Sequence, residues 1–268
     1  MNRSFRLVWS SVRSAWLVAP ESAKSSGGPS RGKTALKGIA AALVSTLCYS
    51  ISVSPASAQA PAGLVDPVLR AGSATIDLTN AQRAVVQQSS QKAVIDWRQF
   101  NVAKDSSIQF VQPNASAIAL NRVTGAQASR IDGSILANGQ VWLINPNGVL
   151  IGKSGRINTH GFLASTLGLS TDNFMQGNYS FQADSAGFGS VVNEGQIISA
   201  QAGYAVLAGR QVKNDGLIQA QMGQVVLASG KAATLDLVGD GLLRFAVTAP
   251  VDGMPAGDES LIENTGRL

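Results

Sequence analysis

A short repeat, marked at its start by glycine, limits the folds that this chain can adopt. Five segments have an aliphatic residue two positions after such a glycine, and they begin at Gly133, Gly155, Gly195, Gly216 and Gly266. The starts lie 22, 40, 21 and 50 residues apart, which indicates a unit of about 21 residues with two insertions. Helical repeats need about 33 residues or more, and the spacing of a leucine-rich repeat is missing. The repeat therefore predicts two short strands and two corners per unit.

The residues beside these glycines favour tight corners. Asparagine precedes three of them by two positions, at Asn193, Asn214 and Asn264. Asparagine and glycine tolerate the sharp turns and left-handed backbone that other residues resist. No amphipathic helical pattern competes with this between residues 106 and 268. We therefore predict an all-β fold, a right-handed parallel β-helix in which each unit forms one coil stacked on the last.

One corner can be predicted in detail. The sequence Asn-Pro-Asn-Gly at 145–148 fits a type I turn, with asparagine in the first position, proline in the second and glycine in the fourth. We expect the apolar runs at 141–144 and 149–151 to form strands that are buried on the side facing the coil and partly covered on the other. Parallel strands of successive coils would then pair along the axis and satisfy the backbone.

Three segments do not fit the repeat. Residues 171–189 carry four aromatic side chains among polar neighbours, and we expect a loop or hairpin lying on the β-helix. Residues 232–259 contain two strand-like runs around Gly-Asp-Gly at 239–241, which predicts a β-hairpin. Alternating runs at 72–78, 85–88 and 93–97 are expected to form a cap, because an uncovered coil would offer its edge to other chains.

The net positive charge of the chain comes from its first 58 residues. The formal net charge of +5 would by itself suggest an anionic partner such as nucleic acid. Residues 1–58 hold seven basic residues and one acid, which leaves 14 of the 21 basic and 15 of the 16 acidic residues for the remainder. The remainder is nearly neutral, and we expect no nucleic-acid partner.

The same residues have the composition of an export signal. A basic stretch precedes the apolar run at 38–53, and small residues then lead to Ala58 and Gln59, an A-x-A-like cleavage site. The apolar run is shorter than the ~20 residues of a membrane-spanning helix. We expect export by the general secretory machinery, cleavage after Ala58 and a mature domain of residues 59–268. The only cysteine, Cys48, would be removed, so disulfides would not stabilise the mature protein.

The leader is longer than an ordinary signal peptide, which has about 15–30 residues. Its start follows the pattern M-N-K-x-Y-R-L-V-W, then a second tryptophan, E-x-A-K and glycine. The matching residues are Met1, Asn2, Arg3, Phe5, Arg6, Leu7, Val8, Trp9, Trp16, Glu21, Ala23, Lys24 and Gly27. This series resembles the extended signal peptide of very large proteins exported by Gram-negative type V secretion.

An ordered series of motifs covers the mature chain from residue 64 to residue 268. They are IDWRQFNV at 95–102, FVQPN at 110–114, ALNRVTG at 119–125, IDGSI at 131–135, NGQVWLINPNG at 138–148 and LASTL at 163–167. Phe174, Gly177, Tyr179 and Phe181 add the pattern F-x-x-G-x-Y-x-F. Together they resemble the N-terminal secretion domain of two-partner secretion exoproteins, the filamentous-haemagglutinin-like or haemagglutination activity domain family.

This resemblance implies a protein secreted to the cell surface by way of the periplasm. A dedicated outer-membrane transporter barrel would bind the domain through its periplasmic domains, and the domain would then start the folding of an adhesin, haemagglutinin or haemolysin. The residues expected in recognition or folding are Asn121, Arg122, Asn145, Pro146, Asn147 and Gly148. A family subset carries a second motif, Asn-Pro-Asn-Leu; the nearest sequence here is Gln-Pro-Asn-Ala at 112–115, which leaves the transporter subfamily open.

Catalytic and metal-binding functions lack suitable residues. His160 is the only histidine and is expected to be a polar corner residue, with no cysteine ligands beside it. Asp96, Asp105 and Asp132 are expected as surface or turn residues at strand ends, and their spacing does not pair them with one another. β-Helix enzymes that cleave acidic polysaccharides use clustered acids. We expect no cofactor and no enzyme. The alternative is an adhesin or glycan-binding module that contacts host cells through this domain itself.

The last residues begin another unit without completing it. Residues 262–268 read IENTGRL and repeat the start of a coil. An exposed final edge would invite aggregation unless something follows it. We therefore expect a fragment or a truncated form of a longer protein, whose downstream part would hold the adhesive, haemolytic or toxic activity. We expect the mature protein to be monomeric.

Overall fold

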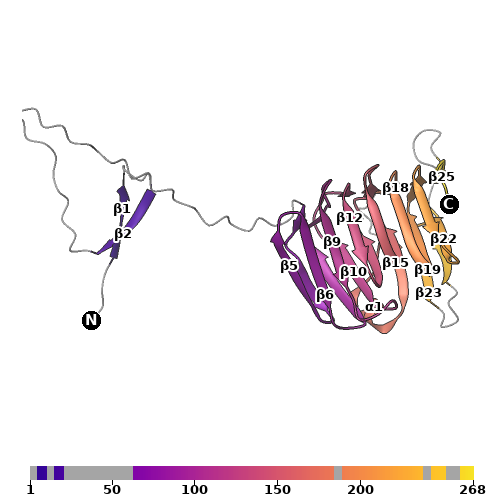
Figure 1. Ribbon diagram of the computed structural model, residues 1–268, viewed down its shortest axis with the longest axis horizontal. Helices are drawn as coiled ribbons and strands as arrows, with labels where there is room; N and C mark the ends of the chain where they lie inside the picture. Colours follow the sequence, from indigo (N-terminus) through magenta and orange to yellow (C-terminus); the bar gives the residue numbers. More distant parts are fainter. Residues whose placement is uncertain (1–4, 11–14, 21–62, 184–188, 238–242, 252–259) are drawn as a thin grey trace, which may run out of the picture. The chain divides into compact units, whose positions relative to one another are not determined.

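The computed structural model describes residues 5–10, 15–20, 63–183, 189–237, 243–251 and 260–268 (Figure 1). The chain divides into two compact units, Met1–Ser54 and Pro55–Leu268. In the first unit, β1 (Phe5–Ser10) pairs antiparallel with β2 (Ala15–Pro20). The expected cleavage position between Ala58 and Gln59 lies outside the described residues. Within the described ranges, no helix has both the length and the apolar character needed to cross a membrane.

The second unit is a parallel β-helix of about six turns, as predicted (Figure 1). Its strands form three faces, and the strands within each face run parallel. The first face contains β6 (Arg83–Gln88), β9 (Ser107–Val111), β12 (Ser134–Ala137), the start of β15 (Arg156–Ser165), the start of β19 (Gln196–Gly209) and β21 (Leu217–Ala220). The second contains β7 (Lys92–Trp97), β10 (Ile118–Val123), β13 (Gln140–Ile144), the ends of β15 and β19, and β22 (Gln224–Ser229). The third contains β11 (Ser129–Ile131), β14 (Val149–Ile151), β18 (Ser190–Asn193), β20 (Gln211–Asn214) and β25 (Ile262–Asn264).

The glycine-marked repeat stacks in register. The residue after each marker glycine pairs with its counterpart in the next coil, through Ser134, Arg156, Gln196, Leu217 and Arg267. These glycines are required because coils approach closely at the corner. A Cβ atom at Gly195 would lie 2.5 Å from the carbonyl oxygen of Gly155, and one at Gly216 would lie 2.2 Å from that of Gly195. Close approach, and not left-handed backbone, explains them, since neither has a positive φ.

Side chains of the second face are buried on both sides. On β13, Val141 and Leu143 point into the coil, while Trp142 and Ile144 belong to a second apolar cluster outside it. All four are at most 2 % exposed, so the outer side of β13 is covered completely, whereas the sequence predicted partial cover. On β14 the outward Leu150 is half-buried, and there the prediction of partial cover is confirmed. The cover of β13 comes from the segments that interrupt the repeat.

The cap is smaller than the sequence indicated. β4 (Val68–Ala71) and β5 (Ala74–Asn80) pair antiparallel with β7 and β6, and β3 (Leu64–Val65) pairs with β8 (Gln99–Phe100). The assignment of residues 85–88 and 93–97 to the cap was wrong. They lie in β6 and β7, which pair parallel with the following coil. The β-helix therefore begins near residue 83.

The two insertions form one antiparallel sheet over the second face. Its strands are β16 (Leu167–Gly168), β17 (Tyr179–Ala183), β23 (Ala232–Leu237) and β24 (Leu243–Ala249). The hairpin predicted in residues 232–259 is present as β23 and β24, with its tip at 239–241 outside the described residues. We call this sheet, with α1, the outer sheet.

A short helix, α1 (Thr171–Gln176), replaces the loop or hairpin expected at the start of residues 171–189. The Ser170 hydroxyl accepts a hydrogen bond from the Asn173 backbone N–H, and Gly177 ends the helix at a φ of 83°. Both are common capping devices. Six residues are too few to produce a visible amphipathic period, so only the two capping residues could have indicated this helix.

Candidate recognition site

The residues predicted for recognition belong to two motifs, and these motifs meet at one end of the second face. Asn121 and Arg122 lie on β10, and the Asn-Pro-Asn-Gly corner follows β13. Arg122 pairs in register with Ile144, the residue before Asn145. Asn147 then donates a hydrogen bond from its side-chain amide to the carbonyl oxygen of Gly125, over 2.9 Å. The corner of one coil is thereby fixed to the motif of the preceding coil.

Asn121 is fully buried and its amide is occupied. Its Oδ1 accepts a hydrogen bond from Trp97 Nε1 at 3.0 Å. Its Nδ2 donates to the carbonyl oxygens of Ala119 at 3.1 Å and Trp142 at 3.3 Å. The side chain links three successive coils and has no surface to offer to a partner.

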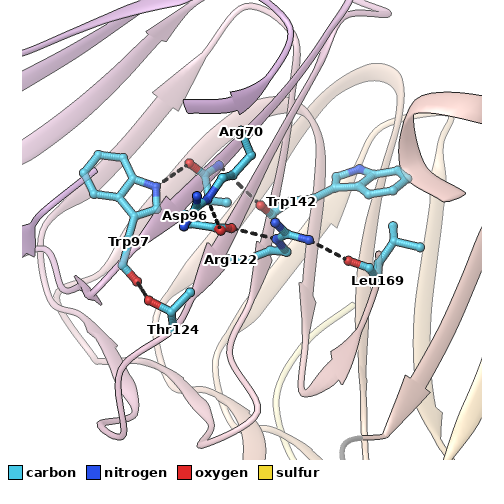
Figure 2. A network of polar contacts seen from close by, with 8 residues as sticks. Arg70, Asp96, Trp97, Arg122, Thr124, Trp142 and Leu169 are labelled. Atoms are coloured by element: carbon cyan, nitrogen blue, oxygen red, sulfur yellow. Dashed lines mark hydrogen bonds and ion pairs between the residues drawn. The ribbon is translucent and has the colours of Figure 1, made fainter. Parts of the chain in front are cut away.

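Arg122 belongs to a polar network between the coils, the cap and the outer sheet (Figure 2). Its Nε donates to Asp96 Oδ1 at 2.8 Å, and Arg70 Nε donates to Asp96 Oδ2 at 2.7 Å. Arg122 Nη1 donates to the carbonyl oxygen of Leu169 at 3.3 Å. Asp96 lies within β7, is only 7 % exposed and carries two ion pairs, so the expectation of a surface or turn residue was wrong for it. A buried carboxylate requires such partners.

The Asn-Pro-Asn-Gly sequence forms a turn closed by a hydrogen bond from the Gly148 N–H to the Asn145 carbonyl oxygen, 3.0 Å long. Asn145 is fully buried. Its Nδ2 donates to the carbonyl oxygen of Gln127 at 2.9 Å and to Ser129 Oγ at 3.0 Å, and its Oδ1 accepts from the Asn147 N–H at 3.0 Å. The Asn145 side chain therefore shapes this corner from inside.

The other three residues of the turn differ in their burial. Gly148 is buried with a φ of +116°, a left-handed conformation that favours glycine. Pro146 is half-buried and its carbonyl oxygen accepts a hydrogen bond from Gly189 at 3.2 Å. Asn147 is exposed. Of the six predicted residues, only Asn147, Pro146 and part of Arg122 are accessible to a partner.

The other polar residues singled out in the sequence lie elsewhere. His160 is half-buried where β15 passes from the first face to the second. Asp132 lies at a bend and pairs with Arg130, and Asp105 lies in an exposed turn at a φ of 66°, so both are surface or turn residues, as expected. No cluster of three or more metal-ligating side chains occurs in the described ranges.

The sequence did not indicate that Arg122 pairs with Asp96 and with the Leu169 carbonyl oxygen, or that Arg70 pairs with Asp96 as well. One signal was available, because Asp96 interrupts the apolar residues of β7, and a charged residue in a buried strand needs a counter-charge. The identity of that counter-charge was not available, since Arg70 and Arg122 each lie 26 residues from Asp96.

Comparison with known proteins adds two family matches. Residues 68–264 match the model of the TPS secretion domain, and residues 1–49 match the Extended Signal Peptide of Type V secretion system. Two proteins named heme/hemopexin-binding protein from Haemophilus influenzae are similar. One is 43 % identical over 110 residues, and the one from strain KW20 is 37 % identical over 166 residues. The matches cover 41 % and 59 % of this chain but 12 % and 18 % of those proteins.

Solved structures are similar as well. The HMW1 secretion domain from Haemophilus influenzae has 35 % identity and a TM-score of 0.65, over 70 % of this chain and 50 % of that one. The filamentous hemagglutinin secretion domain has 17 % identity and a TM-score of 0.53, over 76 % of this chain and 74 % of that one. At that identity the second comparison supports the fold alone.

Proposed function

Because this chain belongs to the family of TPS secretion domains, the secretion domains of two-partner secretion exoproteins, we propose that the corner around Asn147 is a surface by which its outer-membrane transporter recognises it. The protein is exported through the periplasm and secreted to the cell surface. Its family consists of secretion domains and is not an enzyme family. The family implies recognition by an outer-membrane transporter, and the proposal concerns the residues that make the contact.

The state of the Asn147 side chain supports the proposal. Its Nδ2 is held by the Gly125 carbonyl oxygen, which fixes the amide in one orientation. Its Oδ1 accepts no hydrogen bond from the described residues and remains available as an acceptor beside the half-buried Pro146. A rigid polar group of this kind loses little conformational entropy when it binds a partner.

The buried members of the two motifs would have a different role. Asn121, Asn145 and Gly148 shape the coils and have no exposed surface, so they would affect secretion through folding. The secretion domain would thus combine a transporter contact at Asn147 with an interior that helps to start folding of the exoprotein at the cell surface.

Binding of the purified periplasmic domains of the cognate transporter tests this proposal. We expect Asn147→Ala to weaken binding about fivefold or more, the effect of one interface residue worth about 1 kcal/mol, and to reduce secretion with little change in stability. Asn158→Ala provides a matched control, because Asn158 is also exposed but lies on the first face. Parental affinity of the Asn147→Ala protein would contradict the proposed contact.

A further inference from the structure

A cleft of about 650 Å³ lies between the β-helix and the outer sheet. Its floor follows one row of the second face, in which Lys92, Ile118, Gln140, Gly161, Tyr204 and Gln224 pair in register through six successive coils. Its other wall includes Tyr179, Leu237 and Leu243. The cleft therefore runs along the axis of the β-helix, and its volume is within the range of small-molecule sites, about 300–1,000 Å³.

Several polar groups of this cleft have no partner within the described residues. Tyr179 is only 8 % exposed, and its hydroxyl makes no hydrogen bond. Gln140 is equally buried; its Oε1 accepts from the Tyr204 hydroxyl at 2.6 Å, while its Nε2 donates to no protein atom. The side chains of His160 and Gln224 are also unpaired. The Tyr179 hydroxyl and Gln140 Nε2 are not enclosed away from solvent. They face the open cleft, where water or a ligand can satisfy them.

The backbone beside the cleft is strained in two coils. Ala202 has a φ of 59° and Met222 a φ of 51°, and both line the cleft. Left-handed backbone is uncommon for alanine and methionine, in contrast to aspartate, which occupies the two other non-glycine positions of this kind in the described chain. Strain of this type gathers at ligand sites. The left-handed backbone at these two residues is thus a second observation at the cleft, independent of its unpaired polar groups.

The charges in the cleft are unsuited to an anion. Among the described residues that line it there is no aspartate or glutamate. The one permanent cation of that set, Lys92, already donates to the carbonyl oxygens of Phe174 at 3.0 Å and Met175 at 3.2 Å. Burial lowers the pKa of the Lys92 ammonium, which agrees with a group that is withdrawn from water. The remaining polar groups among the described lining residues are neutral amides, the hydroxyls of Ser116, Tyr179 and Tyr204, and an imidazole. They lie next to the apolar side chains of Ile118, Leu237 and Leu243.

A peptide strand is also a poor occupant. The strands of the second face run across the cleft, and their backbone groups point along the axis to neighbouring coils. A chain that lies along the cleft therefore meets a strand edge on its floor only at the last strand, β22, which pairs with β19 alone among the described strands. Sugar hydroxyls, which both donate and accept hydrogen bonds, match the neutral polar groups, and the C–H faces of sugar rings match the apolar wall.

We propose that this cleft binds a neutral oligosaccharide that lies along the axis of the β-helix. Binding would give the secretion domain a contact with surface glycans that is separate from the transporter corner at Asn147. The proposal does not rest on that corner, because the two sites use different residues and different ligands.

Calorimetric titration and saturation-transfer NMR of the secreted protein with lactose, N-acetyllactosamine, chitotriose and maltotriose test the proposal. We expect at least one of these saccharides to bind with a Kd of ~1 mM or tighter. Tyr179→Phe removes only the hydroxyl and Gln224→Ala removes one amide, and each should weaken binding about three- to tenfold, the effect of one lost neutral hydrogen bond. Asn158→Ala on the first face is the matched control and should bind like the parent.

Thermal unfolding of each variant separates loss of the ligand contact from loss of fold. The proposal is overturned if none of the four saccharides binds at ~10 mM, or if Tyr179→Phe and Gln224→Ala bind like the parent. It is also overturned if the same two variants bind the saccharides like the parent but no longer bind the transporter's periplasmic domains. That result would assign the cleft to the transporter.

Discussion

At the scale of single residues, buried asparagine side chains organise the corners of this molecule. Asn121 and Asn145 each bond to neighbouring coils, and near the third face Asn193 Nδ2 donates to Asn214 Oδ1 at 2.7 Å. Asn214 Nδ2 donates in turn to Asn264 Oδ1 at 2.8 Å. An amide carries both donors and an acceptor, so identical side chains in successive coils can form a ladder. The asparagines that preceded glycines in the sequence are the members of this ladder.

The contrast between Asn145 and Asn147 gives a prediction. Asn145→Ala removes the partner of Ser129 Oγ, of the Gln127 carbonyl oxygen and of the Asn147 N–H. We expect a loss of about 1–3 kcal/mol in the free energy of unfolding, because buried polar groups are left unsatisfied. Urea denaturation measures it. Asn147→Ala, at an exposed position in the same turn, should cost well under 1 kcal/mol; equal losses would refute the division between structural and surface asparagines.

At the scale of elements, Asp96 and Lys92 attach the covering segments to the first coils. Asp96 on β7 joins β4 of the cap to Arg122 on β10 and, through Arg122, to the segment before α1. Lys92 donates to two carbonyl oxygens of α1. Trp142 of β13 packs on the outer sheet at 4.8 Å from the Tyr179 ring and donates to the Tyr204 hydroxyl at 2.7 Å. The cap and the outer sheet thus depend on residues of the β-helix that point outward.

Hydrogen exchange of Asp96→Asn tests this attachment. The substitution removes the negative charge between Arg122, whose side chain is 21 % exposed, and Arg70, whose side chain is 52 % exposed, and should loosen β4 (Val68–Ala71). Because Asp96 is buried and Arg70 is half-exposed, the cost lies between the about 0–1 kcal/mol of a surface pair and the about 3–5 kcal/mol of a buried one. We expect faster exchange in β4 and unchanged exchange in β13. The control is Asp132→Asn, which breaks the pair with Arg130, whose side chain is 60 % exposed. Surface pairs contribute about 0–1 kcal/mol, so unchanged β4 exchange in Asp96→Asn would show that the network does not hold the cap.

At the scale of the whole molecule, stability depends on pairing along the axis. The strands of each face bond to the preceding and following coils, and the glycine corner lets those coils approach. Each coil has contacts mainly with its neighbours, as in other repeat proteins, so a defect at one corner acts on the stack on both sides of it. The outer sheet adds a second apolar layer over one face only.

The glycine stack can be tested with Gly195→Ala. The new methyl group would meet the carbonyl oxygens of Gly152 and Gly155 at 2.5 Å, and backbone atoms cannot move away cheaply. We expect a loss of about 1–3 kcal/mol, the usual cost of overpacking, together with a lower melting temperature. Gly168→Ala is the comparison, because its methyl group would lie 3.4 Å from the nearest atom, the Gln182 carbonyl oxygen. Similar melting temperatures for the two variants would mean that close approach does not explain the marker glycines.

The coil, its period and the corner at 145–148 follow from the amino-acid sequence alone, because they depend on local composition and on backbone pairing that any stack of such units makes. The marker glycines at 133, 155, 195 and 216 stack as the spacing predicted. The sequence also indicated the six recognition candidates, but not which of them are accessible.

The partners of the polar residues and the cover of the second face follow from the packing of distant segments and could not be predicted from the sequence. Asp96 finds its partners 26 residues away in both directions, and Arg122 reaches a carbonyl oxygen 47 residues away. The cleft likewise combines one residue row of the coils with strands from two insertions. A sequence pattern describes each segment separately, whereas burial and hydrogen-bond partners depend on how distant segments pack together.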